Sequence, residues 1–450
     1  MILIWVGVDD TDSTSGGCTT YVACMLIKEL TKEKYDIIGY PRLVRLNPNI
    51  PWKTRGNGAV SFLVGKGEGK KTKIGEIREK EVFSYETSSD DSNYDRLKEI
   101  VEQVIEEYAI LGDENTNSGF VLFRNPPSYE VYLKTVRGIV SLKEVKELLD
   151  SSAWYFKGFK NGRGLIGATA SVAWTPVRDR TFELITYRKK EKWGSPRFVD
   201  DVSTKKMDKI VSSTFDNYDY ENHHNRLVPN SPCPVLYGVR GENPVDLFKA
   251  KSIVKSEKVD SWIIFETNQG TDDHLQEKNI RDIQPYDSVI TQGVVSKEPF
   301  TLQGGHVVFE IKDETGFIDC AAYEPTKQFR KIVRKLIPGD MVEVYGGVRE
   351  TPFTVNLEKI RVKMLVEKYE KVENPVCPVC GKHMKSIGRN QGYRCIKCGS
   401  KSNYPIVKRA ERGLKPGFYE VPVCARRHIS KPLKRIKREN GESKLNHKSF

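Results

Sequence analysis

Three aspartates near the N-terminus are the residues of this chain best suited to hold a metal ion. Asp9, Asp10 and Asp12 follow a short apolar run that ends at Gly7. Carboxylates so close together repel one another, so the arrangement is costly unless a cation neutralises it. Mg²⁺ takes one or two carboxylates and completes its shell with water and phosphate oxygens. The cluster therefore indicates a magnesium–phosphate site, or an acidic turn between a strand and a helix.

The residues after the aspartates favour the phosphate interpretation. Residues 13–20 are almost all small, from Ser13 through Gly17 to Thr19. Backbone N–H groups in such a stretch can approach a phosphate closely. Residues 21–30 carry apolar side chains at helical spacing, and the dipole of a helix favours a phosphate at its N-terminus.

A second stretch carries cations next to a sharp turn. Lys53 and Arg55 precede Gly56 and Asn57, and an apolar strand is expected over residues 59–64. Glycine and asparagine adopt positive φ readily, so the loop is sharply turned. The two cations can neutralise phosphate charge, but without other evidence the pattern favours a surface hairpin with two solvated cations.

The metal site with the most specific spacing lies near the C-terminus. Cys377 and Cys380 form one CxxC pair, Cys395 and Cys398 form another, and 14 residues separate the pairs. A glycine follows each pair and permits a tight knuckle turn. Four thiolates satisfy tetrahedral Zn²⁺ with no open position, so the expected zinc is structural.

Charge is concentrated at one end of the chain. The protein has 450 residues and a net charge of +13, and residues 406–450 hold 13 Lys and Arg against 4 Glu. A basic excess in one segment is typical of a protein that binds a polyanion. For the last 20 residues we expect a solvated tail that becomes ordered only on RNA.

The composition also excludes several classes of protein. No run of about 18 apolar residues is present, so a membrane protein is not expected. The N-terminus lacks a basic region and a cleavage site, so it is not a signal peptide. Nine cysteines, only four of them in CxxC pairs, indicate a reducing compartment, and we expect a cytoplasmic protein.

The order of predicted elements indicates a multidomain α+β protein. We expect an α/β domain over 1–178, in which strands and helices alternate. A β-α-β-β-α-β order over 179–284 is typical of a ferredoxin-like domain. Five strands over 285–368, with a helix between the third and fourth, predict an OB-fold β-barrel. A zinc ribbon over 372–405 and a basic tail over 406–450 complete the chain.

Some local predictions are open to direct test. Residues 65–92 are charged and rich in Gly and Ser, so we expect a mobile excursion. Residues 158–174 are dense in glycine and predict a strand of small residues. Of the aromatic residues available for stacking bases in the barrel, we expect half to be core; they are Phe300, Phe309, Tyr345 and Phe353. Asn115, Asn117 and Ser118 line a site or form an Asx-turn.

Several long motifs together resemble one family. WVGVDDTDSTSGGCTTY, NPNIPWKTRGNGAVSF, PCPVLYGVRG and TNQGTDDH, followed by an OB-fold and a CPVC…CIKC ribbon, are similar to archaeal tRNA(Ile2) 2-agmatinylcytidine synthetases. The resemblance covers essentially the full length. It implies a kinase-like N-terminal domain and ATP-dependent attachment of agmatine to C2 of the wobble cytidine, so that the anticodon reads AUA.

The resemblance also implies roles for individual residues. Phosphorylation of the cytosine C2 oxygen would make it a leaving group that agmatine displaces, and phosphoryl transfer depends on Mg²⁺ and cationic clamps. Asp9, Asp10 and Asp12 would hold Mg²⁺. Thr19 aligns with a threonine that the family autophosphorylates. The implied ATP-binding residues are Asp10, Ser13, Gly17, Lys53, Arg55, Gly56 and Asn57.

Two carboxylates, Asp216 and Asp273, are candidates to bind the agmatine guanidinium. The barrel and ribbon would bind the anticodon and acceptor regions of tRNA(Ile2), and no obligate protein partner is expected. The family often has Pro after the NTN triplet, where this chain has Ser118, which weakens a catalytic role for that loop.

Two other functions also fit parts of the sequence. A non-catalytic binder of single-stranded nucleic acid would explain residues 287–450 but leaves the first 280 residues without a role. A tRNA ligase that uses another amine would keep the ATP chemistry and change the product.

Overall fold

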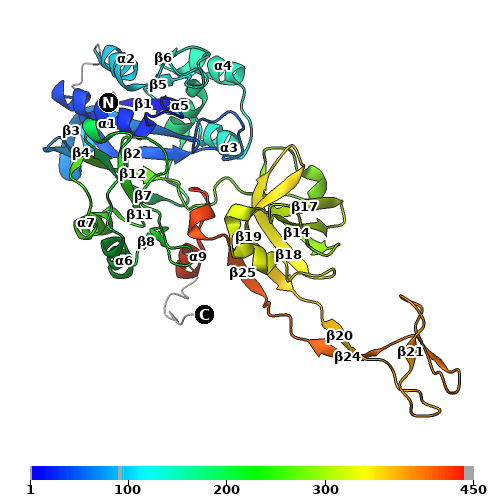
Figure 1. The fold of residues 1–450 in the computed structure, drawn as a ribbon. Helices are drawn as coiled ribbons and strands as arrows, with labels where there is room; N and C mark the ends of the chain where they lie inside the picture. The colour runs from blue at the N-terminus through cyan, green and yellow to red at the C-terminus, as the bar shows by residue number, and fades with distance from the viewer. Residues whose placement is uncertain (1–2, 90–93, 95, 440–450) are drawn as a thin grey trace.

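The computed structural model describes residues 3–89, 94 and 96–439. Figure 1 shows a large α/β body made of the chain up to Thr267, a β-barrel beside it, and a small ribbon carried on a two-stranded arm. Within the described residues, no helix combines the length and apolar character needed to cross a bilayer.

One ten-stranded sheet forms the centre of the α/β body. Its order is β6-β5-β1-β3-β4-β2-β12-β7-β11-β8. Strand β1 (Ile4–Asp9) lies in the interior, antiparallel to both β3 and β5. The other strands are β2 (Asp36–Arg45), β3 (Gly58–Ile77), β4 (Lys80–Ser89), β5 (Gly119–Phe123), β6 (Tyr155–Gly158), β7 (Thr181–Arg188), β8 (Thr214–Phe215), β11 (Val235–Gly241) and β12 (Val259–Thr267).

The sheet runs without interruption from the expected α/β domain into the ferredoxin-like domain. Strand β2 pairs in parallel with β12, with Arg42 opposite Glu266. The second domain has the predicted β-α-β-β-α-β order, built from β7, α6 (Asp201–Ile210), β8, β11, α7 (Pro244–Ile253) and β12. The predicted boundary at residues 178 and 179 therefore divides one sheet and stays a prediction.

Helices cover both faces of the first half of the sheet. Helices α1 (Thr19–Lys32) and α2 (Leu97–Tyr108) share a core with β1 and β3, in which Val22, Leu26 and Val101 pack near Val6 and Phe62. The other helices of this half are α3 (Tyr129–Arg137), α4 (Leu142–Ser152) and α5 (Gly164–Ala173).

The prediction of a mobile excursion over 65–92 is wrong for the residues that the structure describes. Strand β3 continues to Ile77, and β4 returns beside it with Lys71 opposite Tyr85. Buried Ile74, Ile77 and Val82 anchor the hairpin to the sheet. The charged residues that suggested mobility lie on the exposed face. Residues 90–92 lie outside the described residues.

The predicted strand of small residues over 158–174 is also wrong, because most of this stretch forms helix α5. Nine of its ten residues are buried, so it lacks the polar face that makes a helix recognisable. Gly164 and Gly167 leave no space for a side chain: a Cβ on either would collide with Asp9. The small residues let α5 lie directly against the end of β1.

The OB-fold prediction is confirmed. The barrel strands are β14 (Ser288–Val295), β16 (Val307–Lys312), β17 (Phe317–Ala322), β18 (Met341–Val348) and β19 (Thr354–Met364), and the short α8 (Phe329–Val333) lies between the third and fourth. Phe309 is core, and Tyr345 is half-buried. Phe300 and Phe353 are 50% and 44% exposed, so both are accessible for stacking.

The zinc-ribbon region lies at the end of an arm. Strands β20 (Lys368–Glu373) and β24 (Ile406–Ala410) pair to form the arm, and three short strands, β21 (Lys385–Ser386), β22 (Tyr393–Arg394) and β23 (Lys401–Ser402), form the ribbon beyond it.

The C-terminal segment (residues 406–439) packs against the rest of the protein, so the prediction of a solvated tail over the last 20 residues is wrong for residues 431–439. After β24 it adds β25 (Gly417–Glu420) to barrel strand β19, and it ends in α9 (Leu433–Glu439) against the α/β body. Arg435 is buried there and ion-pairs with Asp179 and Glu242. The specific carboxylate partners explain why this basic segment is ordered without RNA. Residues 440–450 lie outside the described residues.

Candidate functional site

The three aspartates lie at the end of β1, in one wall of a pocket of about 480 Å³. Burial raises the pKa of Asp9 well above its usual value, and the neighbouring Asp10 raises it further. The pKa of Asp10 is also raised by burial, which Arg163 partly offsets from 3.5 Å. In the described chain Asp9 makes no ion pair with a basic side chain. Burial and mutual repulsion thus disfavour the charged forms of these two carboxylates, and a bound cation would stabilise them.

A polar triplet holds the aspartate loop in place. The Thr116 hydroxyl donates to the Asp12 carbonyl at 2.7 Å, and the Ser118 hydroxyl donates to the Asp10 carbonyl at 2.8 Å. The backbone N–H of Asn117 donates to the Asp10 carboxylate at 3.2 Å. The loop 115–118 thus supports the site, and the hydroxyl of Ser118 makes one of its bonds.

The small-residue stretch forms a turn that leads into α1. Ser13 and Gly16 form a backbone bridge, and Gly17 has a φ of +70°, which glycine adopts without strain. Thr19 begins the helix, lines the pocket and accepts a hydrogen bond from the Thr11 hydroxyl at 3.2 Å. Ser13 and Gly17 shape the turn but do not line the pocket.

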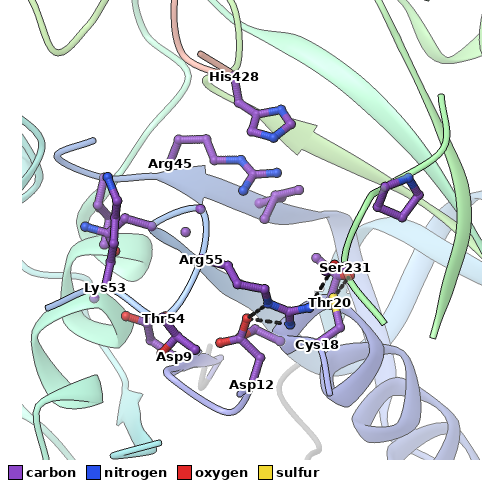
Figure 2. Close-up of a pocket in the computed structure, with 18 of the residues that line it drawn as sticks. Asp9, Asp12, Cys18, Thr20, Arg45, Lys53, Thr54, Arg55, Ser231 and His428 are labelled. Carbon is purple, nitrogen blue, oxygen red and sulfur yellow. Dashed lines mark hydrogen bonds and ion pairs between the residues drawn. The ribbon is translucent and has the colours of Figure 1, made fainter. Parts of the chain in front are cut away.

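The loop containing Lys53 and Arg55 folds over the aspartates, as Figure 2 shows. Arg55 donates to Asp12, to the Gly17 carbonyl at 2.6 Å and to the Ser231 hydroxyl at 3.0 Å, so it connects three segments of the pocket wall. Partial burial and the nearby charge of Arg427 lower the pKa of Lys53 to about 8. Gly56 and Asn57 line the same wall.

Both domains and the C-terminal segment contribute to this pocket. The first domain supplies the aspartates and residues 43–58, the ferredoxin-like domain supplies residues 226–240, and the C-terminal segment supplies Val423, Arg426 and His428. A pocket between domains is a common place for a small-molecule site.

The two candidate agmatine carboxylates are in different surroundings. Asp216 lines the pocket and ion-pairs with Arg426, which also bonds Glu420 at 2.6 Å. Asp273 accepts a hydrogen bond from Tyr132 at 2.8 Å and is not among the pocket-lining residues.

Sequence reasoning identified Arg55 but missed other arginines of this pocket. Arg163 approaches Asp10 from the N-terminus of α5, the helix that was expected to be a strand. Arg45, Arg226 and Arg240 line the opposite wall from three separate segments. No spacing in the sequence relates these residues, so only the fold brings them together.

The predicted metal ribbon has the expected cysteine geometry. The four Sγ atoms of Cys377, Cys380, Cys395 and Cys398 lie within 4.8 Å of one another. Gly381 and Gly399 have φ values of +68° and +77°, and their N–H groups donate to the carbonyls of Cys377 and Cys395 at 2.9 Å. Such knuckles present four thiolates in the arrangement that tetrahedral Zn²⁺ requires.

Four family models match the chain in succession. They are the TiaS TCKD domain over residues 5–161, the TiaS FLD domain over 162–274, an OB-fold nucleic acid binding domain over 289–372 and the TiaS C-terminal zinc ribbon domain over 374–414.

Curated relatives and solved structures agree with these matches. Proteins named tRNA(Ile2) 2-agmatinylcytidine synthetase TiaS from Archaeoglobus fulgidus and Methanocaldococcus jannaschii are 44% and 42% identical; the alignments cover 96% and 97% of this chain and 97% and 99% of those proteins. A crystal structure described as the TiaS–tRNA(Ile2)–ATP complex superposes with a TM-score of 0.83 at 42% identity, covering 97% of this chain and 98% of that one. A TiaS–tRNA(Ile2)–AMPCPP–agmatine complex gives a TM-score of 0.81 at 39% identity over the full length of both chains.

Proposed function

This chain belongs to the TiaS family of tRNA(Ile2) 2-agmatinylcytidine synthetases, and we propose that its interdomain pocket is where ATP, agmatine and the wobble cytidine meet. The protein is an ATP-dependent tRNA-modifying enzyme that attaches agmatine to the wobble cytidine of tRNA(Ile2). The observation that carries the proposed site is the single pocket that joins Asp9, Asp10 and Asp12 to Lys53 and Arg55.

Asp9, Asp10 and Asp12 would hold Mg²⁺, because the donor set is all carboxylate and the acids lack enough basic partners to balance them. When bound, the ion neutralises charge on the transferring phosphoryl group. Lys53 and Arg55 would place further positive charge on the nucleotide phosphates, and Thr19 and the N-terminus of α1 lie beside them. Ser13 and Gly17 contribute by shaping the turn, and Gly56 and Asn57 by shaping the cationic loop.

The reaction that this site would support has two displacements. First the C2 oxygen of cytosine attacks a phosphorus of ATP, a C2–O–P linkage forms and the P–O bond to the leaving part of ATP breaks. Then the primary amine of agmatine attacks C2, an N–C2 bond forms, the C2–O bond breaks, phosphate leaves and the amine nitrogen loses a proton. The wobble base must leave the anticodon stack to reach a pocket of this kind.

Phosphorylation of Thr19 fits the same pocket. A phosphate there would carry nearly two negative charges beside the incoming cationic agmatine. The Thr19 hydroxyl faces Thr11 at 3.2 Å and lies within the pocket wall that would hold the nucleotide.

We assign the guanidinium of agmatine to Asp216, because Asp273 is engaged by Tyr132 away from the pocket. Asp216 holds the guanidinium of Arg426. The guanidinium of agmatine would therefore replace that of Arg426 at Asp216, since the two groups have the same shape and charge. Arg426 would keep Glu420 as its partner.

The barrel and ribbon would bind the tRNA. Exposed Phe300 and Phe353 supply stacking surfaces, and the ribbon carries exposed Lys382, Lys385 and Arg389 around its four cysteines. Structural Zn²⁺ would hold the ribbon in shape. Because its tRNA substrate is matured in the cytoplasm, we infer that the enzyme works there.

The direct test supplies the purified chain with Mg²⁺, ATP, agmatine and a tRNA(Ile2) transcript. We expect ATP consumption and a wobble nucleotide whose mass increases by one agmatine residue. Lysine in place of agmatine should give no product, which separates this enzyme from a ligase for another amine. Binding of the transcript without any ATP turnover would instead identify a non-catalytic RNA-binding protein.

A further inference from the structure

The wall of the pocket opposite the aspartates carries an unusual concentration of positive charge. Arg45 is the last residue of β2, Arg240 lies in β11, and Arg226 follows a short hairpin of the ferredoxin-like domain. All three line the pocket together with His428 of the C-terminal segment. Figure 2 shows Arg45 and His428 on this side, above the loop that carries Arg55.

His428 shows how closely the three arginines gather. Its pKa is held well below the usual value, first by burial and then by the charges of Arg240, Arg45 and Arg226. The imidazole is therefore neutral at physiological pH and adds no further positive charge. All three guanidinium groups lie near enough to one ring to repel its proton.

The protein itself supplies too little negative charge for this cluster. Glu183 lies 3.3 Å from Arg240 and 4.0 Å from Arg45, and it also accepts a hydrogen bond from Gln269. Two other carboxylates near Arg226 have partners of their own: Asp216 ion-pairs with Arg426, and Asp219 accepts the backbone N–H groups of Asn222 and Cys424. Of these three carboxylates, Glu183 alone is left to balance the charge of three guanidinium groups.

Some hydrogen-bond donors of the cluster, on Arg45 and Arg226, are also unused. Arg45 Nε is buried and has no hydrogen-bond partner within the described chain. The Arg226 guanidinium makes no hydrogen bond or ion pair with any residue that the structure describes, although the residue is half-buried. A desolvated guanidinium without a partner is costly, so these donors indicate a ligand.

We propose that Arg45, Arg226 and Arg240 form a binding site for a phosphate group, separate from the aspartate end of the pocket. Guanidinium groups match phosphate oxygens in charge and in bidentate geometry. The proposal rests on the proposed function, which brings two phosphate-bearing molecules here. One source is the RNA backbone beside the wobble nucleotide, because a base turned into the pocket brings its own phosphates. The other source is ATP.

Arg226→Gln is the sharpest test, because the substitution removes no hydrogen bond or ion pair of the guanidinium with the described protein. Arg96→Gln is the matched control: it removes an arginine from the solvent-exposed start of α2, far from the pocket. Two affinities are measured for each protein: that of ATP without RNA, and that of a tRNA(Ile2) anticodon stem-loop without ATP. The stem-loop is used with natural phosphates and with a neutral methylphosphonate on either side of the wobble nucleotide.

We expect Arg226→Gln to weaken one of these two ligands about tenfold, the loss typical of one charged hydrogen bond in a desolvated site. If the phosphate belongs to RNA, the salt dependence of binding should fall by about one phosphate contact, and methylphosphonate should weaken wild-type binding but not binding by the variant. If it belongs to ATP, the stem-loop should bind normally. Arg226→Lys should restore part of the loss.

If folded Arg226→Gln and Arg45→Gln proteins bind both ligands as tightly as the wild type does, this inference is overturned. The proposed function still stands in that case, provided that the wild-type protein modifies tRNA. Failure of the wild-type protein to modify tRNA would count against the function itself, whatever the two variants bind.

Discussion

The Arg55 guanidinium lies against the Asp12 carboxylate, with Nε at 2.7 Å and Nη2 at 2.5 Å from the same oxygen. The remaining N–H groups of Arg55 reach Gly17 and Ser231. One side chain thus connects the aspartate loop, the turn before α1 and the ferredoxin-like domain. A lysine cannot reproduce this, because its ammonium lacks the planar fork of a guanidinium.

Arg55→Lys should raise the KM for ATP about tenfold while the protein stays folded, since it keeps the charge and loses the geometry. Arg178→Lys, at an exposed position outside the pocket, is the control. Steady-state kinetics with varied ATP gives the result. An unchanged KM would mean that Arg55 has no part in placing the nucleotide.

Asp10→Asn should abolish modification and leave tRNA affinity close to normal. The substitution keeps the shape of the side chain and removes one carboxylate from the proposed magnesium site. Asp150→Asn, on the exposed side of α4, controls for the loss of one negative charge. Product formation and filter binding are measured on the same preparations. Undiminished modification would exclude Asp10 as a metal ligand.

The raised pKa values of Asp9 and Asp10 predict that activity rises with pH. Both acids keep their protons above the usual value for aspartate of about 4, and Mg²⁺ binds the deprotonated forms. Mg²⁺ binding should therefore release protons and strengthen as the pH increases. Calorimetry in two buffers of different ionisation enthalpy measures that release, and an equal heat in both buffers would contradict it.

The lowered pKa of Lys53 predicts that activity falls at higher pH. Its pKa is lowered to about 8, so its charge is present below that pH and is lost above it. The falling limb of kcat/KM for ATP should lie near this value, because kcat/KM reports groups of the free enzyme. Lys53→Arg, which stays charged, should move the limb upward; a limb that stays in place would assign it to another group.

Cys395→Ser should weaken tRNA binding and leave the α/β body folded. Zinc sites of this type hold small ribbons together, and the arm separates the ribbon from the rest of the protein. Zinc content, tRNA affinity and ATP affinity are compared with those of Cys424→Ser, whose thiol lies outside the cluster. Normal tRNA binding by a zinc-free variant would show that the ribbon is dispensable for it.

Arg435→Gln should lower the free energy of unfolding by about 1.5–3 kcal/mol, the range for a hydrogen bond to a charged group, because Asp179 and Glu242 lose their buried guanidinium partner. Lys431, 2.8 Å from Asp179, remains as a second positive charge. Arg438→Gln removes a more exposed charge, 3.8 Å from Glu242, and should cost far less. Urea unfolding of the two proteins makes the comparison. Equal losses would mean that burial of Arg435 adds nothing to its ion pairs.

Local sequence patterns were enough to predict many of the structural elements of this protein. Strand β1, helices α1 and α2, the five barrel strands and the cysteine ribbon were predictable, because each has a clear apolar period or a diagnostic spacing. The acidic loop was predicted to be a metal–phosphate site from Asp9, Asp10 and Asp12, and the structure places all three in the wall of one pocket; the metal role stays a prediction. These features depend on residues that are neighbours in the sequence.

Only the tertiary structure revealed the features that depend on contacts between residues far apart in the sequence. Helix α5 is buried on every side, so its sequence has no amphipathic period to recognise. The C-terminal segment is ordered because Arg435 finds Asp179 and Glu242 across more than 190 residues of chain. Arg45, Arg226 and Arg240 meet in one wall because strand β12 joins the two domains in a single sheet. Electrostatic fit between remote segments leaves no periodic trace in a sequence, and for that reason only the folded chain reveals it.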